Sequence, residues 1–222
     1  MTDTERARRV AEHLIRIRAV HCNLENPFVF TSGILSPVYV DIRRLIGFPA
    51  ERREVMDLMA RMVELEIGLE AFDVVAGGET AGIPYAAWLA ERLDRPMIYV
   101  RKQPKAFGRG AQIEGRLEEG QRVLLVEDLV TDGGSKFNFL RGIRQAGATV
   151  GHLVVVFEYG TIPETRPALA AEGVELHSLT TWATLLDVAE SKGYFSPVEI
   201  AETRRFLADP KAWGTTRRQA GA

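Results

Sequence analysis

The fold is decided by residues 123–135, which read VLLVEDLVTDGGS. The apolar start predicts a buried strand, two acids follow it, and a hydroxyl- and glycine-rich turn then leads into a helix. Such a turn aims backbone N–H groups and a helix N-terminus at one point, which suits a phosphate monoester. Glu127 and Asp128 would repel phosphate, so we expect them to accept hydrogen bonds from hydroxyls of a sugar carried beside it. An ordinary strand-to-helix turn with Ser135 as the N-cap explains the acids and glycines equally well.

Strands and helices alternate along the rest of the chain. Apolar runs rich in β-forming residues lie at 72–76, 97–100, 122–126, 152–157 and 174–179. Helices are expected within the first twenty residues, at 49–69, 83–93 and 136–146, and from a capped start at 196–199. This alternation predicts an α/β fold with a mainly parallel sheet and helices on both faces. The tail after Trp213 is polar and is expected to fray.

Length and composition favour one catalytic unit. A chain of 222 residues with 46% hydrophobic content can bury one full core but leaves little room for two independent domains. Its formal net charge of -2 argues against binding to nucleic acid or to an anionic membrane. The single cysteine, Cys22, cannot form an internal disulfide, and no run approaches the roughly 18 apolar residues of a membrane helix. We therefore expect a cytoplasmic protein.

Two further segments could bind anions. Residues 74–84, VVAGGETAGIP, put a second glycine-rich turn after a strand, and two such turns at the ends of parallel strands would face one crevice. Glycines after a strand are nevertheless more often structural. Residues 101–116, RKQPKAFGRGAQIEGR, concentrate five cations. Alone they would be explained as a solvated hairpin, but beside two anion-binding turns they are better explained as a flexible lid that closes on a diphosphate.

The histidines give no catalytic signal. His13, His21, His152 and His177 lie on separate predicted elements, so no histidine cluster is expected. No Ser–His–Asp order or nucleophile elbow is evident. Covalent catalysis and a catalytic transition metal are therefore not expected, and no residue is assigned as a metal ligand.

Taken together, the three segments resemble the type I phosphoribosyltransferases, whose signature is an apolar strand, two acids, two apolar residues, Thr and a small glycine-rich turn. Residues 123–135 match that signature throughout. Within the group, residues 24–207 resemble orotate phosphoribosyltransferase. The specific markers are TSGILSPVYVD at 31–41, GETAGIP at 78–84, and YVRK at 99–102 followed by Lys105 and by QIEG at 112–115.

The resemblance implies that orotate and 5-phosphoribosyl 1-diphosphate give orotidine 5′-monophosphate and diphosphate, with Mg²⁺ carried mainly by the diphosphate substrate. It implies one domain, with a sheet core at about 70–180 and a small hood from about 1–45 and 180–208. It also implies a homodimer in which the 101–116 loop acts in the neighbouring subunit. Departure of diphosphate separates charge, so the chemistry needs positioning and electrostatics more than a nucleophile.

Individual roles follow from the same resemblance. The catalytic residues would be Arg101, Lys102 and Lys105. The residues that hold 5-phosphoribosyl 1-diphosphate would be Thr80, Ala81, Glu127, Asp128, Leu129, Val130, Thr131, Asp132, Gly133, Gly134 and Ser135. The residues at the orotate positions would be Ser32, Gly33, Tyr39, Val40 and Thr131.

Four positions depart from the pattern of some members. Those members have Lys where this chain has Thr31 and Ala81, His where it has Phe107, and Arg where it has Tyr159. Three of these changes remove cationic contacts to substrate, and Phe107 removes a possible proton donor.

Two rival functions stay open. One is a phosphoribosyltransferase for a purine or uracil, although the segment 32–39 favours orotate. The other is a non-catalytic regulator that senses 5-phosphoribosyl 1-diphosphate and binds nucleic acid, which would require an added domain or a basic surface.

Overall fold

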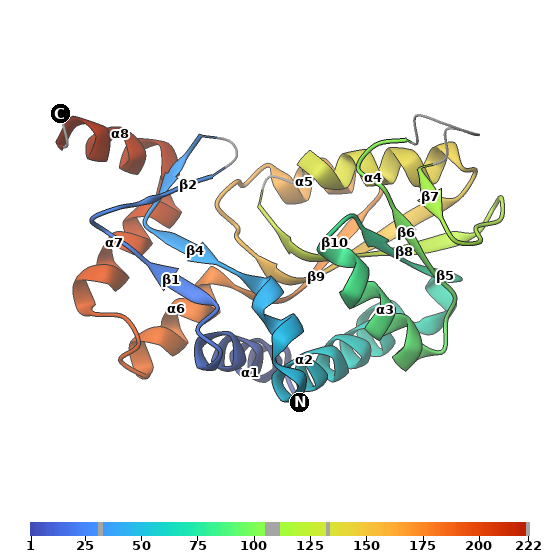
Figure 1. Cartoon of the computed structure of the whole chain (residues 1–222), viewed down its shortest axis with the longest axis horizontal. Coiled ribbons are helices and arrows are strands. Elements are labelled where there is room, and N and C mark those ends of the chain that lie inside the picture. The colour runs from blue at the N-terminus through green and yellow to red at the C-terminus, as the bar shows by residue number, and fades with distance from the viewer. Residues whose placement is uncertain (31–32, 105–111, 132–133, 221–222) are drawn as a thin grey trace.

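A six-stranded sheet forms the centre of the protein, in a computed structural model that describes residues 1–30, 33–104, 112–131 and 134–220 (Figure 1). The strand order is β10-β9-β8-β5-β6-β7. The strands are β5 (Val74–Gly78), β6 (Met97–Val100), β7 (Ile113–Glu114), β8 (Arg122–Val130), β9 (Thr149–Glu158) and β10 (Glu175–Thr181). All neighbours pair in parallel except β7, which runs antiparallel to β6. The predicted α/β fold with a mainly parallel sheet is confirmed.

Helices cover both faces of this sheet because successive strand residues point to opposite sides. On β8, Leu124 and Val126 pack with the core that includes α1 (Asp3–Arg16), α2 (Pro49–Met62) and α3 (Gly82–Leu93). Val123 and Leu125 pack with the other core, which includes α4 (Gly134–Gln145) and α5 (Thr165–Ala171). The near-continuous apolar run of β8 is therefore the sequence of a strand buried on two sides.

Strand β8 is longer than predicted, and this corrects the start of the turn. The expected strand ended at Val126, whereas β8 continues through Val130. Its partner β9 is longer as well, and the ladder extends to the pairs Leu129 with Phe157 and Val130 with Glu158. Residues 127–130 are therefore strand, and the turn begins at Thr131.

The terminal segments lie together beside the sheet, at the left of Figure 1. Strands β1 (Val20–Cys22) and β4 (Val38–Val40) form one antiparallel pair, and β2 (Phe28–Val29) and β3 (Leu35–Ser36) form another. With them lie α6 (Trp182–Ser191), α7 (Pro197–Ala208) and α8 (Pro210–Ala220). Short helical turns at Ile42–Gly47, Val63–Ile67 and Leu69–Ala71 complete the described elements.

The helix boundaries agree only in part with those predicted from the sequence. The capped start of α7 is confirmed, since Ser196 and Glu199 form a reciprocal capping box. The expected helix over 49–69 is divided into α2 and a wider π-helical turn that ends at Gly68, where φ is +83°. The expectation of a frayed tail is wrong for the described residues after Trp213, because they continue α8 and Trp213 itself is buried. Within the described residues, no helix has the length and apolar character needed to span a bilayer.

Candidate active site

The two glycine-rich turns leave the sheet at the same edge. Strands β5 and β8 are parallel neighbours, with Gly77 opposite Val126, so their carboxyl ends lie side by side. A Cβ atom on Gly78 or on Gly82 would overlap the Glu127 carboxylate, and on Gly78 it would also lie 2.5 Å from the Phe139 ring. Glycine is required at both positions because the first turn packs directly on the end of β8. The expected common edge is confirmed for the described parts of both turns; Asp132 and Gly133 lie outside the described residues.

Glu127 forms a buried ion pair that the sequence analysis did not anticipate. Lys136 Nζ donates to Glu127 Oε2 at 2.7 Å and lies 3.3 Å from Ser135 Oγ. The two charged side chains are 6% and 9% exposed. Burial raises the pKa of Glu127 to about 7, and the Lys136 ammonium opposes that shift. One signal was present in the sequence, because a lysine in the first turn of a helix is unfavourable unless a nearby acid compensates it.

Asp128 points away from Glu127. Adjacent strand residues face opposite sides, and Asp128 lines a cavity between the sheet edge and the terminal segments. The Leu129 N–H donates to Asp128 Oδ1 at 2.8 Å. Burial is the main cause of a raised Asp128 pKa. From the sequence we predicted that both acids accept hydrogen bonds from sugar hydroxyls, whereas only Asp128 lines this cavity.

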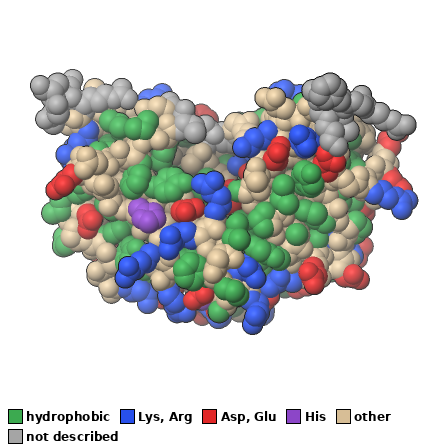
Figure 2. Space-filling model, in the orientation of Figure 1, with side chains coloured by type: hydrophobic (Ala, Val, Ile, Leu, Met, Phe, Trp, Pro, Cys, Tyr) green, Lys and Arg blue, Asp and Glu red, His purple; other side chains and the backbone are tan. Residues whose placement is uncertain are grey.

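The cavity has a volume of about 310 Å³. Its lining residues are Val29, Phe30, Ile34, Tyr39, Arg43, Asp128, Leu129, Thr131, Tyr159, Thr161, Ile162, Phe206 and Pro210. The ring of Phe30 packs edge-on to Tyr159 at 5.7 Å. Figure 2 shows the molecule hollowed between the terminal segments and the sheet. The cavity is therefore lined both by aromatic rings and by the Asp128 carboxylate near the end of β8.

Arg43 is the only cation among the described residues that line the cavity. Its Nη2 donates to the Tyr39 hydroxyl at 3.1 Å, and its Nε lies 3.6 Å from Asp41 Oδ1. The Tyr39 hydrogen bond is the main cause of a raised Arg43 pKa. Arg43 was not predicted from the sequence as a site residue, although it lies only four residues after Tyr39.

Only some of the predicted orotate residues lie at the cavity. Tyr39 and Thr131 line the cavity. The Val40 side chain is fully buried and does not line it, and the Val40 N–H donates to the Tyr159 hydroxyl at 3.0 Å. Gly33 lies at a turn with φ of +80°, where its N–H donates to the Phe30 carbonyl. Ser32 and Thr31 lie outside the described residues.

The cationic segment is anchored at the same sheet edge. Its ends are tied together, because the Arg101 N–H donates to the Gln112 carbonyl and the Gln112 side chain donates to the Arg101 carbonyl. The Lys102 N–H donates to Glu79 Oε2 at 2.8 Å, and the Asn138 amide donates to the Lys102 carbonyl. Lys102 therefore starts beside the 78–82 turn and α4. Lys105 and Phe107 lie outside the described residues.

Comparison with known proteins agrees with this geometry. Residues 48–186 match the model of the phosphoribosyl transferase domain. An orotate phosphoribosyltransferase of Dinoroseobacter shibae is 55% identical over 209 residues, which cover 94% of this chain and 92% of that protein. The chain belongs to the orotate phosphoribosyltransferase family.

Solved structures of other members of the orotate phosphoribosyltransferase family share the fold. The crystal structure from Aeropyrum pernix is 34% identical, with a TM-score of 0.68, and the match covers 83% of this chain and 99% of that one. The Mycobacterium tuberculosis enzyme in complex with 5-phospho-α-D-ribosyl 1-diphosphate is 26% identical, with a TM-score of 0.61 and coverage of 81% and 98%.

Proposed function

We propose that the chain transfers the 5-phosphoribosyl group from 5-phosphoribosyl 1-diphosphate to orotate, giving orotidine 5′-monophosphate and diphosphate in pyrimidine biosynthesis. One observation carries the proposal. The buried carboxylate of Asp128 lies between a phosphate-type turn and a cavity of aromatic side chains. A ribose that donates hydroxyls to Asp128 would have its 5′-phosphate on one side and a planar base on the other.

The 5′-phosphate would bind in the turn from Thr131 to Ser135. Helix α4 begins at Gly134, so its first N–H groups and the positive end of its dipole face this turn. The Lys136 ammonium is held 3.3 Å from Ser135 Oγ and adds positive charge at the same place. Leu129 and Val130 would contribute through their backbone, which connects β8 to the turn.

The diphosphate would bind at Thr80 and Ala81, at the start of α3, where the first N–H groups of the helix point toward the turn. Arg101, Lys102 and Lys105 would neutralise the charge that develops as it leaves. Mg²⁺ fits this site because the cavity offers carboxylate and hydroxyl oxygens and, among its described lining residues, no imidazole or thiolate. When bound with the substrate, Mg²⁺ would supply further charge neutralisation.

Orotate would bind in the aromatic end of the cavity, with Arg43 holding its carboxylate. Orotate is flat and anionic, so it needs an apolar wall and a cation. Phe30, Tyr39 and Tyr159 supply the wall. Arg43 supplies the charge that the chain lacks at Thr31 and Tyr159, and its hydrogen bond to Tyr39 fixes its direction.

The wider assembly is part of the same proposal. We propose one domain in which the terminal segments form a hood over the site, and a cytoplasmic homodimer in which the 101–116 loop acts in the neighbouring subunit. The chain's one cysteine supports a reducing compartment.

The test follows the loss of orotate absorbance with purified protein, Mg²⁺ and 5-phosphoribosyl 1-diphosphate. Wild-type protein should consume orotate, and Lys102→Ala should lower kcat by about 100-fold because a charge that stabilises the leaving diphosphate is lost. Lys192→Ala, a change in the surface pair with Glu12, is the matched control and should keep full activity. A panel of purines and uracil completes the experiment. A product formed from one of those bases and not from orotate would overturn the proposal.

The assignment of Arg43 has a separate test. Arg43→Gln should raise the KM for orotate by about 10- to 100-fold, the value of a hydrogen bond to a charged group. The KM for 5-phosphoribosyl 1-diphosphate should change much less. Arg53→Gln, on the exposed side of α2, is the control. An unchanged orotate KM in the Arg43 variant would remove this residue from the site.

A further inference from the structure

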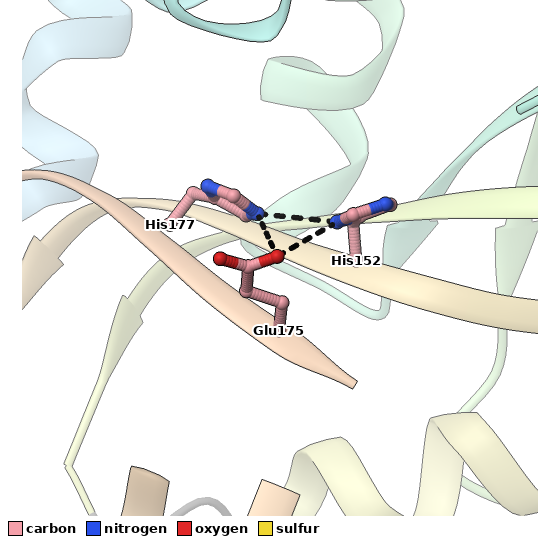
Figure 3. Close-up of side chains that lie close together, drawn as sticks. All are labelled: His152, Glu175 and His177. Carbon is pink, nitrogen blue, oxygen red and sulfur yellow. Dashed lines mark hydrogen bonds and ion pairs between the residues drawn. The ribbon is translucent and has the colours of Figure 1, made fainter. Parts of the chain in front are cut away.

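We propose that His152, Glu175 and His177 form a binding site for a zinc-type divalent cation at the amino ends of β9 and β10. The three side chains point toward one another in Figure 3. One ligand atom from each lies within 4.8 Å of the other two. The expectation that the histidines form no cluster was wrong. The proposal is independent of the proposed enzymatic function.

Strand register explains why these residues converge. Glu175 on β10 is the direct parallel partner of His152 on β9. His177 follows Glu175 by two residues, so its side chain leaves the same face of β10. Three residues from two adjacent strands therefore meet on one side of the sheet. The sequence did not predict this cluster because the periodicity of each segment does not show how two strands pair.

The separations fit metal coordination. His152 Nδ1 lies 3.1 Å from His177 Nε2, and Glu175 Oε2 lies 3.9 Å and 3.7 Å from those two nitrogens. The point equidistant from the three atoms, calculated from these three separations, is about 2.1 Å from each. Zinc bonds to imidazole nitrogen and carboxylate oxygen have this length, roughly 2.0–2.2 Å. A cation at this point needs no movement of the backbone.

The chemistry of the ligands selects the class of ion. Two imidazoles and one carboxylate suit zinc and similar transition metals, whereas magnesium and calcium prefer oxygen ligands alone. The His152 side chain is 24% exposed and that of Glu175 is 70% exposed. Water can therefore reach the open side and complete a four-coordinate shell. Without a cation, the 3.1 Å contact is a hydrogen bond between the two imidazoles, in which one ring nitrogen donates and the other accepts.

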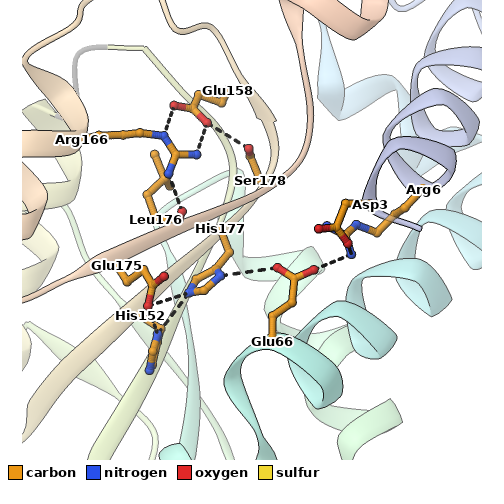
Figure 4. Close-up of polar contacts among 10 residues, drawn as sticks. All are labelled: Asp3, Arg6, Glu66, His152, Glu158, Arg166, Glu175, Leu176, His177 and Ser178. Carbon is orange, nitrogen blue, oxygen red and sulfur yellow. Dashed lines mark hydrogen bonds and ion pairs between the residues drawn. The ribbon is translucent and has the colours of Figure 1, made fainter. Parts of the chain in front are cut away.

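A second carboxylate supports the orientation of His177. Glu66 Oε2 lies 3.8 Å from His177 Nδ1, on the side of the ring away from the cluster (Figure 4). Arg6 holds the other Glu66 oxygen at 2.5 Å and also contacts Asp3 at 3.2 Å. A proton on Nδ1 would face Glu66 and leave Nε2 free to bind the ion. Histidines that bind metals commonly have such a carboxylate behind them.

The site lies at the opposite ends of the strands from the candidate active site. Glu175 begins β10, while Asp128 lies near the carboxyl end of β8. Arg6 belongs to α1 and Glu66 to the turn after α2, so an ion here would link β9 and β10 to both. The expected role is stabilisation of the fold rather than catalysis. A ligand that binds only the folded state raises the unfolding midpoint in proportion to the logarithm of its concentration.

The experiment uses the full chain, stripped with a chelator and titrated with Zn²⁺ against a chromophoric competitor. Wild-type protein should bind one equivalent of Zn²⁺. His152→Ala and Glu175→Gln should each weaken this binding by at least 10-fold. Glu66→Gln should weaken binding about 10-fold through His177. His21→Asn is the control for a histidine outside the cluster and should bind as wild type does.

Two further measurements remove alternative explanations. Co²⁺ in place of Zn²⁺ should give a ligand-field spectrum without a sulfur charge-transfer band, which separates this site from Cys22. Zn²⁺ should raise the thermal midpoint of wild-type protein and leave that of His152→Ala unchanged. Because Glu175 is mostly exposed, Glu175→Gln should keep the fold. This variant therefore tests the site even if a histidine variant fails to fold. Equal Zn²⁺ affinity in wild type and in Glu175→Gln would overturn the proposal, as would no binding by wild-type protein.

Discussion

Replacement of Lys136 by Met should destabilise the protein by an amount that depends strongly on pH. Lys136 is the ion-pair partner of Glu127, and both side chains are more than nine-tenths buried. Met keeps the length and apolar stem of Lys but removes the ammonium. Loss of one member of a buried pair leaves the other charge without compensation, which commonly costs about 3–5 kcal/mol.

The magnitude follows from the Glu127 pKa. Burial raises this pKa from 4.5 to about 7 in the folded protein, so the folded state holds the proton more tightly than the unfolded state. The contribution of Glu127 to stability is therefore fully present below about pH 4.5 and is lost as the pH rises through about 7. Without Lys136 the folded pKa rises further, and the loss continues above pH 7. Each additional pH unit lowers the free energy of unfolding of the variant by up to about 1.4 kcal/mol, which amounts to about 2 kcal/mol between pH 7 and pH 8.5.

Urea unfolding followed by tryptophan fluorescence at pH 6 and pH 8.5 tests this reasoning. Lys136→Met should unfold close to wild type at pH 6, where Glu127 is mainly protonated in both proteins, and at clearly lower urea at pH 8.5. Lys192→Met is the control, because the Lys192–Glu12 pair is 47% and 35% exposed and should contribute no more than about 1 kcal/mol. Protein concentration is held constant so that association does not change the midpoint. An equal loss at both pH values would refute the assigned pKa.

Other substitutions test the packing around the site. Gly78→Ala should destabilise the protein by at least about 1–3 kcal/mol because its Cβ would overlap the Phe139 ring, while Gly47→Ala, with open space around it, should be nearly neutral in thermal unfolding. Tyr159→Phe should cost about 1–3 kcal/mol in urea unfolding because it leaves the buried Val40 N–H without its acceptor; an unchanged midpoint would show that water replaces the hydroxyl. Asp128→Asn should keep the thermal midpoint and lower kcat/KM for 5-phosphoribosyl 1-diphosphate by about 100-fold, and full activity would remove Asp128 from the ribose site.

The sequence predicted the parts of the fold that depend on local pattern. The apolar runs located every strand of the parallel sheet, and the Ser196–Glu199 signal located the start of α7. Strand ends were less accurate, since β8 gains its last four residues from pairing with an equally long β9. Pairing partners lie far apart in the chain, and periodicity within one segment does not identify them.

The site was predictable at the level of motifs and less so for single side chains. Tyr39, Asp128 and Thr131 line one cavity, while the roles predicted for them stay predictions. Val40 does not line it, because alternation along β4 turns its side chain into the core. Lys136 and Arg43 were missed because their roles depend on contacts with Glu127 and with Tyr39, and the sequence pattern does not show which side chains make such contacts.

The alternation of one strand explains how two adjacent acids acquire different properties. Glu127 faces the 78–82 turn and α4, where a buried lysine is its only described side-chain partner for a hydrogen bond. Asp128 faces the cavity, where the Arg43 guanidinium opposes the rise in the Asp128 pKa that burial causes. A shift of β8 by one residue would exchange these faces, which would separate Glu127 from Lys136 and remove Asp128 from the cavity. The pairing register of β8 with β9 is therefore as necessary to the proposed activity as the side chains that would touch the substrates.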